Sequence, residues 1–282
     1  MAHDSEAQER RRIDAQYDIA HPRPSVVAAI GALGLRAGQL VLDAGCGPGA
    51  LLGLLLGAVA PGGRVVGLDL DGDNVEVAAS LWPERIASGE LALDRGDVTN
   101  LPFATGAFDA VWTSLVLHHV AEPATALREL ARVVAPGGLV AVLDGDDSAS
   151  FPFLPWSPDL EERLRAAVRR GAADNYGGKL DGTILPYLGR DLPRLLREAG
   201  LTAITLQAFA DVDGGPLDPA REAKVREWLR GWVDGRIRDY LTPRDRDAVL
   251  ALADPDNPAY VLASPDFFLC RTWLLATGRV RR

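Results

Sequence analysis

Short apolar runs alternate with helix-like segments between residues 38 and 144. Gly, Pro and Asp bound the runs, and most are continuously apolar, which is typical of strands that are buried on both faces. The predicted strands are 40–42, 64–68, 91–93, 110–113 and 139–143, and the predicted helices between them are 51–59, 73–86 and 124–134. This alternation predicts an α/β fold of the Rossmann-like, doubly wound type, with a mostly parallel sheet.

After Asp144 the pattern becomes less regular. Helices are expected at 160–168, 191–199, 219–237 and 243–253, and strands at 203–209 and 267–276, the last of them antiparallel. We interpret the extra helical pieces as insertions that cover the sheet edge where ligands bind. The expected organisation is N-terminal helices over the ligand site (1–37), a ligand-binding core (38–148), a cap insertion (149–190), a core helix and strand (191–211), a helical cap insertion (212–265), and a final core strand and tail (266–282).

Composition and charge narrow the class of protein. The 282 residues contain no apolar stretch long enough to cross a bilayer, and the first twelve residues are too polar for a secretory signal. Two cysteines, Cys46 and Cys270, are too few for a disulfide framework. These features predict a cytoplasmic protein that does not associate with membranes, either a monomer or a homodimer. The net charge of −9 argues against a nucleic-acid partner and favours a small-molecule substrate.

A glycine-rich turn, DAGCGPG at 43–49, follows the first predicted strand. Glycines there permit a tight turn and let backbone N–H groups approach a ligand next to a helix N-terminus. A dinucleotide site would read Gly45, Gly47 and Ala50. Two details count against it: Asp43 stands where such a strand is normally apolar, and the third glycine is at 49.

Acidic residues follow the next two predicted strands. Asp69 comes twenty residues after Gly49, where a carboxylate can accept both hydroxyls of a ribose. Asp97 follows the third strand and could accept a hydrogen bond from an adenine amino group. Together with Asp43, these carboxylates are expected at the carboxyl edge of the sheet, where ligands of such sheets bind.

Residues 41–144 resemble the core of class I S-adenosylmethionine-dependent methyltransferases, particularly the ubiquinone/menaquinone-biosynthesis-like group. The resemblance is carried by VLDAGCGPG at 41–49, GLDL at 67–70, GDVTNLPF at 96–103, FDAVWTSLVLHHV at 108–120 and RVVAPGGLVAVLD at 132–144. It implies S-adenosyl-L-methionine as cofactor. The implied contacts are Asp43, Gly45 and Gly47 with the methionine portion, Asp69 with the ribose, Leu70, Asp97 and Val98 with adenine, Ser114 and Leu115 beneath the sulfonium, and Tyr17 folded over the cofactor.

Candidates for catalysis follow the fourth and fifth strands. An oxygen nucleophile needs a base, and His118 or His119 could supply it, with His119 preferred as nearer the cofactor. Asp147, next to Asp144 and Asp146, could be a base or contact substrate. Clustered carboxylates also suit hard cations, but Ser114 stands where metal-dependent relatives carry an acidic ligand, so we expect no metal.

Two aromatic residues in Pro- and Gly-rich stretches, Trp156 and Tyr176, are candidates for a substrate wall, and NYGG at 175–178 has the turn chemistry of a lid. The expected function is methyl transfer to an O, N or C atom of a small, partly apolar molecule. A role in specialised metabolism is compatible with this function. The alternatives are a protein of this fold that binds the cofactor without transferring methyl, such as a cyclase or regulator, and a nicotinamide-dependent oxidoreductase.

Overall fold

The computed structural model describes residues 2–146, 154–176 and 188–281. These residues belong to two compact units. The first is built from parts of 1–145, 188–209 and 273–282, and the second from parts of 146–187 and 210–272. The divisions fall within strands β6 (Thr202–Gly214) and β7 (Phe268–Arg279), so both strands contribute residues to each unit.

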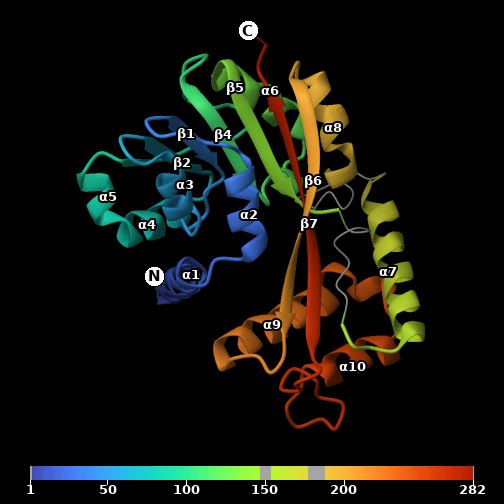
Figure 1. Cartoon of the computed structure of the whole chain (residues 1–282). Helices are drawn as coiled ribbons and strands as arrows, with labels where there is room; N and C mark the ends of the chain where they lie inside the picture. The colour runs from blue at the N-terminus through green and yellow to red at the C-terminus, as the bar shows by residue number, and fades with distance from the viewer. Residues whose placement is uncertain (1, 147–153, 177–187, 282) are drawn as a thin grey trace. The chain divides into compact units, whose positions relative to one another are not determined.

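The first unit holds the parallel part of the sheet. Its strands are β1 (Leu40–Ala44), β2 (Arg64–Asp69), β3 (Leu91–Arg95), β4 (Phe108–Ser114) and β5 (Val134–Asp144). Within the described residues, the seven strands follow the order β3-β2-β1-β4-β5-β7-β6. β1 to β5 pair in parallel, and β7 is antiparallel to β5. The predicted α/β, mostly parallel sheet with an antiparallel last strand is confirmed (Figure 1).

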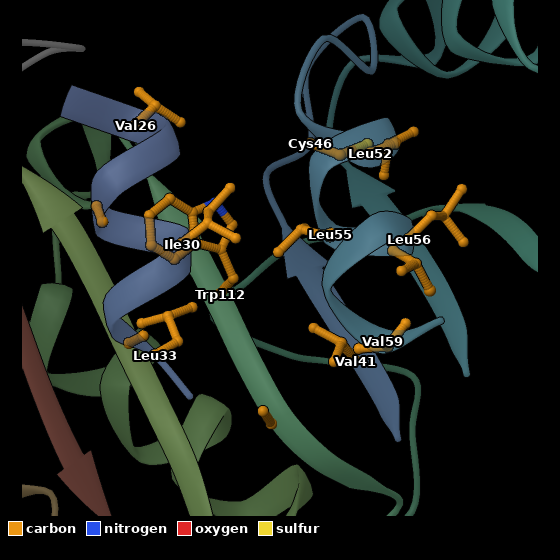
Figure 2. Close-up of a cluster of buried hydrophobic side chains, with 14 of the residues drawn as sticks. Val26, Ile30, Leu33, Val41, Cys46, Leu52, Leu55, Leu56, Val59 and Trp112 are labelled. Carbon is orange, nitrogen blue, oxygen red and sulfur yellow. The ribbon is translucent and has the colours of Figure 1, made fainter. Parts of the chain in front are cut away.

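Helices cover both faces of this sheet because its strands alternate buried side chains between the faces. On one face, α2 (Pro24–Ala32) and α3 (Leu52–Val59) pack over Trp112 of β4, as Figure 2 shows. α4 (Gly72–Leu81) joins that layer through Ala78. α6 (Pro123–Val133) and α8 (Leu188–Glu198) pack against each other and β5. α1 (Ala2–Ala20) lies against α4.

The helix expected at 73–86 is two helices, so that prediction was wrong. α4 ends at Leu81 and α5 spans Pro83–Ala87. Between them Trp82 has φ −125° and ψ 39°, because a residue before proline is excluded from the helical region. The break places the indole beneath the glycine turn, where Trp82 Nε1 donates a hydrogen bond to the Gly49 carbonyl at 2.9 Å. A β-carbon at Gly53 would lie 2.5 Å from the same indole.

Replacing Trp82 with alanine should lower the free energy of unfolding by about 3 kcal/mol, because it empties a packed site and removes a hydrogen bond. Trp82→Phe keeps most of the ring and should cost only about 1 kcal/mol. Urea denaturation followed by circular dichroism measures both. Equal midpoints for the two variants would contradict the assigned packing.

β5 begins five residues earlier than predicted. Pro136, Gly137 and Gly138 lie between the predicted helix 124–134 and the predicted strand 139–143, yet β5 runs from Val134 through them. The pairing with β4 explains this, because the register jumps from Phe108–Val134 to Ala110–Leu139 and the intervening residues form an irregularity.

The second unit is mainly helical. It contains α7 (Pro158–Tyr176), α9 (Pro219–Gly231), a π-helical segment (Trp232–Arg236), a 3-10 turn (Arg238–Tyr240) and α10 (Pro243–Leu252). The single helix expected at 219–237 therefore ends at Gly231. The buried core of this unit includes Leu164, Val233, Val249, Leu262 and Phe267. Within the described residues, every helix is either too short or too polar to span a bilayer.

Candidate functional site

A cavity of about 430 Å³ opens at the carboxyl edge of the sheet, within the first unit. The residues around it come from the ends of β1, β2 and β4 and from the segments that follow β1, β2, β3 and β4. They are Asp43, Gly45, Cys46, Gly47, Leu51, Asp69, Leu70, Asn74, Asp97, Val98, Ser114, Leu115, Val116, His119 and Val120. Every predicted cofactor contact except Tyr17 is among them, and so is the predicted base His119.

The glycine turn forms one wall of the cavity. Gly45 has φ +82° and donates its N–H to the Leu68 carbonyl at 2.7 Å. A β-carbon there would lie 2.3 Å from a methyl group of Val116, so both the backbone angle and the close approach require glycine. Gly47 has φ +54° and donates its N–H to Asp69 Oδ2 at 2.8 Å. The turn after β1 is thereby fixed to the residue that ends β2.

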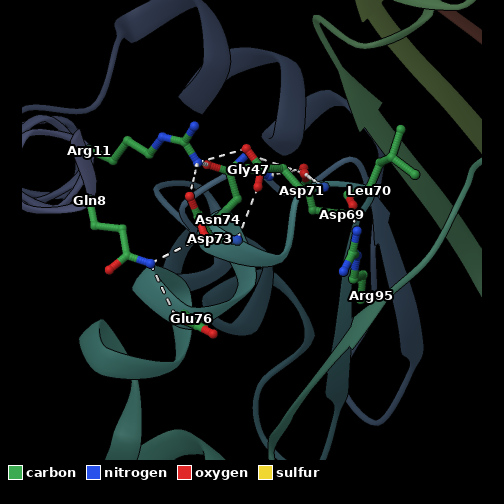
Figure 3. A network of polar contacts seen from close by, with 10 residues as sticks. All are labelled: Gln8, Arg11, Gly47, Asp69, Leu70, Asp71, Asp73, Asn74, Glu76 and Arg95. Carbon is green, nitrogen blue, oxygen red and sulfur yellow. Dashed lines mark hydrogen bonds and ion pairs between the residues drawn. The ribbon is translucent and has the colours of Figure 1, made fainter. Parts of the chain in front are cut away.

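Asp69 is the centre of a polar network that Figure 3 shows. Besides Gly47, its carboxylate accepts hydrogen bonds from the Asp71 N–H at 2.9 Å and from Asn74 Nδ2 at 3.2 Å, both to Oδ1. Asp71 is the N-cap of α4 and accepts from the Asp73 N–H. The three donors hold the Asp69 side chain where it lines the cavity, and Oδ2, which accepts only one of them, keeps a lone pair for a further donor.

Helix α1 joins the same network from outside. Arg11 donates to Asp71 Oδ2 at 2.7 Å and to Asn74 Oδ1 at 3.3 Å, and Gln8 donates to Asp73 and Glu76 of α4 (Figure 3). Tyr17 lies on α1, with its ring stacked on His21 at 4.5 Å, and is not among the residues that line the cavity. Its predicted position over the cofactor stays a prediction.

Asp43 is the deepest carboxylate of the site. It is 2% exposed, and its Oδ2 has no hydrogen-bond partner among the described residues. Burial, and secondarily the negative charge of Asp69, raise the pKa of Asp43 from 3.8 to about 7. No lysine or arginine stands among the described residues around the cavity. An unpaired buried carboxylate costs free energy, so this position favours a ligand that brings a cation or a strong donor.

The outer part of the cavity combines an apolar rim with a polar edge. Leu70 is 64% exposed although it is a large apolar residue, and it lines the cavity. Val98 also lines the cavity and is buried. Asp97 accepts a hydrogen bond from the Thr99 N–H at 2.8 Å, which holds its carboxylate in place. An apolar rim beside a carboxylate suits a flat, apolar ring that carries an amino group.

The end of β4 forms the floor. Leu115 has φ +58°, a left-handed conformation that is rare for leucine, and its N–H donates to the Leu143 carbonyl at 2.9 Å. Backbone strain of this kind is concentrated at functional sites, where surrounding structure maintains it. Ser114 and Leu115 both line the cavity, as their predicted place beneath the cofactor requires. The sequence carries no signal for the strain.

The two histidines occupy different places. His119 lines the cavity, whereas His118 does not. The Nδ1 atom of His118 lies 2.6 Å from Asp144 Oδ1, and its backbone N–H donates to Asp144 Oδ2 at 3.3 Å. Asp144, at the end of β5, is buried and also accepts from the Gly145 N–H at 2.7 Å. Sequence reasoning gave Asp144 no role with His118, although adjacent parallel strands bring their ends together.

The remaining predicted residues lie elsewhere. Trp156 is 8% exposed in the second unit, where its ring stacks on Trp232 with 6.2 Å between centroids, and it belongs to that unit's core. Tyr176 ends α7, but its side chain lies outside the described residues. Asp147 and residues 177–178 of the expected lid also lie outside them. The roles of these residues stay predictions.

Comparison with known proteins assigns the core to a family. Residues 42–142 match the family model described as "Methyltransferase domain". This segment is a methyltransferase domain of the class I type. Its matched range begins in β1 and ends in β5, so it contains the glycine turn, Asp69 and the end of β4.

Curated relatives of the methyltransferase domain include proteins of two bacteria. An uncharacterised 37.1 kDa protein in a transposon of Streptomyces fradiae is 38% identical over 70% of this chain and 53% of its own length. A demethylmenaquinone methyltransferase of Staphylococcus aureus is 38% identical over 44% of this chain and 48% of its own length. The chain thus spans about half the length of these relatives.

A solved structure has the same fold. A putative methyltransferase from Bacillus halodurans superimposes with a TM-score of 0.58 over 91% of this chain and 99% of its own, at 18% sequence identity. At that identity the likeness concerns the fold alone.

Proposed function

We propose that this protein transfers a methyl group from S-adenosyl-L-methionine to a small, partly apolar molecule. One observation carries the proposal: the cavity of the methyltransferase domain is lined both by the buried, unpaired Asp43 and by Asp69. The ammonium or the sulfonium of the cofactor can pair with Asp43, and its ribose can donate a hydrogen bond to Asp69. The residues of this site therefore fit the group that the fold implies.

Charge distinguishes this cofactor from a dinucleotide. A dinucleotide places a doubly negative pyrophosphate at the glycine turn, next to Asp43 and Asp69. The described residues around the cavity include Asp43, Asp69 and Asp97 and no lysine or arginine to offset them. The repulsion of like charges disfavours the nicotinamide alternative, whereas S-adenosyl-L-methionine gains attraction from the same carboxylates.

The chain's own residues have limited tasks in such a reaction. S-adenosyl-L-methionine supplies an activated methyl group when bound, so the protein must orient it and exclude water. Gly45 and Gly47 would permit close approach of the methionine portion, and Asp69 would hold the ribose. Leu70 and Val98 enclose adenine, whose amino group would donate to Asp97. Ser114 and the strained Leu115, which both line the cavity, would contact the centre of the cofactor.

A small molecule is the favoured acceptor. The net charge of −9 weakens binding to nucleic-acid phosphates, and a curated relative carries the name demethylmenaquinone methyltransferase. We propose that the purified chain acts as a monomer or a homodimer, which sedimentation velocity measures.

Calorimetric titration tests the cofactor assignment. We expect S-adenosyl-L-methionine and S-adenosylhomocysteine to bind with dissociation constants of roughly 1 to 100 μM, in the range of ordinary substrate affinities, and NAD not to bind. NAD binding in the absence of S-adenosyl-L-methionine binding would instead assign an oxidoreductase.

A transfer assay separates methyl transfer from cofactor binding alone. The protein is incubated with methyl-labelled S-adenosyl-L-methionine and a panel of small phenols, alcohols, amines and activated carbon acids. Label in an extracted product supports the proposal. Label that never leaves a tightly bound cofactor across the panel would favour the alternative of a cyclase or regulator.

A further inference from the structure

We infer that His118, held by Asp144, is the general base of this site and that the acceptor atom is a hydroxyl oxygen. This inference rests on the proposed methyl transfer and assigns its acceptor class. It also reverses the sequence-based preference for His119.

Asp144 sets the tautomer of His118. Asp144 is 1% exposed at its side chain and accepts from two backbone N–H groups, those of His118 and Gly145. Its Oδ1 lies 2.6 Å from His118 Nδ1. An ionised carboxylate can only accept hydrogen bonds, so Nδ1 has to carry the proton of this contact. In neutral His118 that leaves the lone pair on Nε2, the atom that can take a proton.

The imidazole of His118 lies next to the cofactor cavity. His118 belongs to the short turn Leu117–His119, which directly follows the cavity-lining residues Leu115 and Val116. Its ring lies 4.0 Å from the ring of His119, which does line the cavity. His118 is therefore beside the cofactor cavity but outside its lining. An acceptor approaches the methyl group from outside the cofactor, so its base belongs in that position.

A base at this position favours a hydroxyl as the acceptor. An uncharged amine attacks with a lone pair that is already available, and it loses its proton only afterwards. A hydroxyl oxygen is a weak nucleophile until its proton is removed, so a base fixed by a buried carboxylate suits a hydroxyl. The O–H proton passes to His118 Nε2 while a bond forms between the oxygen and the methyl carbon. The C–S bond breaks and its electron pair stays on sulfur, giving a methyl ether and S-adenosylhomocysteine, and His118 then returns the proton to water.

The probe is a series of para-substituted phenols of graded acidity, with methyl-labelled S-adenosyl-L-methionine. In His118→Ala, kcat should fall about 100-fold for the least acidic phenols and little for phenols that are already ionised at the assay pH. Asp144→Asn should show the same trend with a loss of about tenfold, because the amide no longer fixes the tautomer. The dissociation constant of S-adenosyl-L-methionine should stay within about twofold, since neither side chain lines its cavity. Added imidazole should partly restore the kcat of His118→Ala for the least acidic phenols.

Asp245→Asn is the matched control, because Asp245 is also a buried, hydrogen-bonded carboxylate but lies in the second unit, paired with Arg163 at 2.8 Å. Asp245→Asn should lower the free energy of unfolding, but any fall in kcat relative to the wild type should be the same for every phenol. Nitrogen-15 spectra of the ligand-free protein show which ring nitrogen of His118 carries the proton, and they require no substrate. We expect the proton on Nδ1 in the wild type.

An equal loss for all phenols, or His118 protonated only at Nε2, would overturn the inference. So would a wild-type protein that binds S-adenosyl-L-methionine and methylates amines but no phenol, an outcome that leaves the proposed methyl transfer intact. Failure to bind S-adenosyl-L-methionine at all would instead refute the proposed function.

Discussion

Replacing Asp69 with alanine should weaken the binding of S-adenosyl-L-methionine by about 100-fold, because a hydrogen bond to a charged group contributes about 1.5–3 kcal/mol and a ribose hydroxyl would lose its acceptor. The structure adds a second reason. The same carboxylate accepts from the Gly47 N–H at 2.8 Å and from the Asp71 N–H at 2.9 Å. Alanine therefore also removes the side-chain bond between Gly47 and the end of β2, and only the backbone bonds of Gly45 and Cys46 to Leu68 still hold the glycine turn there. Calorimetric titration of the two proteins measures the effect.

Two further variants separate ribose binding from the support of the turn. Asp69→Asn keeps one acceptor oxygen and the shape of the side chain, so it should lose about tenfold in affinity. Asp71→Asn changes the neighbouring carboxylate, which caps α4 and pairs with Arg11 but does not line the cavity. Asparagine is an equally good N-cap, so affinity should stay within about threefold. Wild-type affinity in Asp69→Ala would refute the assignment of Asp69.

The sequence was sufficient to predict the sheet and the main residues around the cavity. Buried parallel strands leave continuous apolar runs, and a turn that needs positive φ leaves glycines, so Gly45, Gly47 and Asp69 could be placed together. The break at Trp82 was not predicted, because the helical spacing of apolar residues in 73–86 continues past Pro83. The backbone of Trp82, the residue before that proline, leaves the helical conformation and ends α4.

Other features depend on contacts between distant residues, which a single sequence does not contain. The contact of His118 with Asp144 joins residues 26 positions apart, and it changes which histidine is the candidate base. The strain at Leu115 depends on its N–H bonding to Leu143 of the neighbouring strand. In both cases the cause is the pairing of β4 with β5.

Replacing Asp43 with asparagine should stabilise the ligand-free protein at neutral and alkaline pH. The same substitution should weaken the binding of the cofactor. The pKa of Asp43 is raised from 3.8 to about 7, mainly by burial. Below pH 4 the carboxyl is neutral in both the folded and the unfolded state, and the protein keeps its full stability. Between pH 4 and pH 7 only the unfolded state gives up the proton, so stability falls, and above pH 7 the loss is complete.

Asp43→Asn lacks this loss, so its free energy of unfolding should exceed that of the wild type by on the order of 2 kcal/mol at pH 8 and by little at pH 4. Urea denaturation of the ligand-free proteins across that range measures the difference. A constant offset between the two proteins at every pH would show that the Asp43 carboxyl titrates with an ordinary pKa.

The cofactor should respond to pH in the opposite direction. Only ionised Asp43 offers an unscreened buried charge to the ammonium or sulfonium, so ligand affinity should rise about fivefold from pH 6 to pH 7 in the wild type, relative to Asp43→Asn. Binding at pH 7 should release about half a proton, because about half of the Asp43 carboxyls are protonated beforehand. Calorimetry in buffers of different ionisation enthalpy counts that proton. If asparagine at position 43 leaves both the affinity and the proton count unchanged, Asp43 does not face the cationic part of the cofactor, and the strongest argument against a dinucleotide is lost with it.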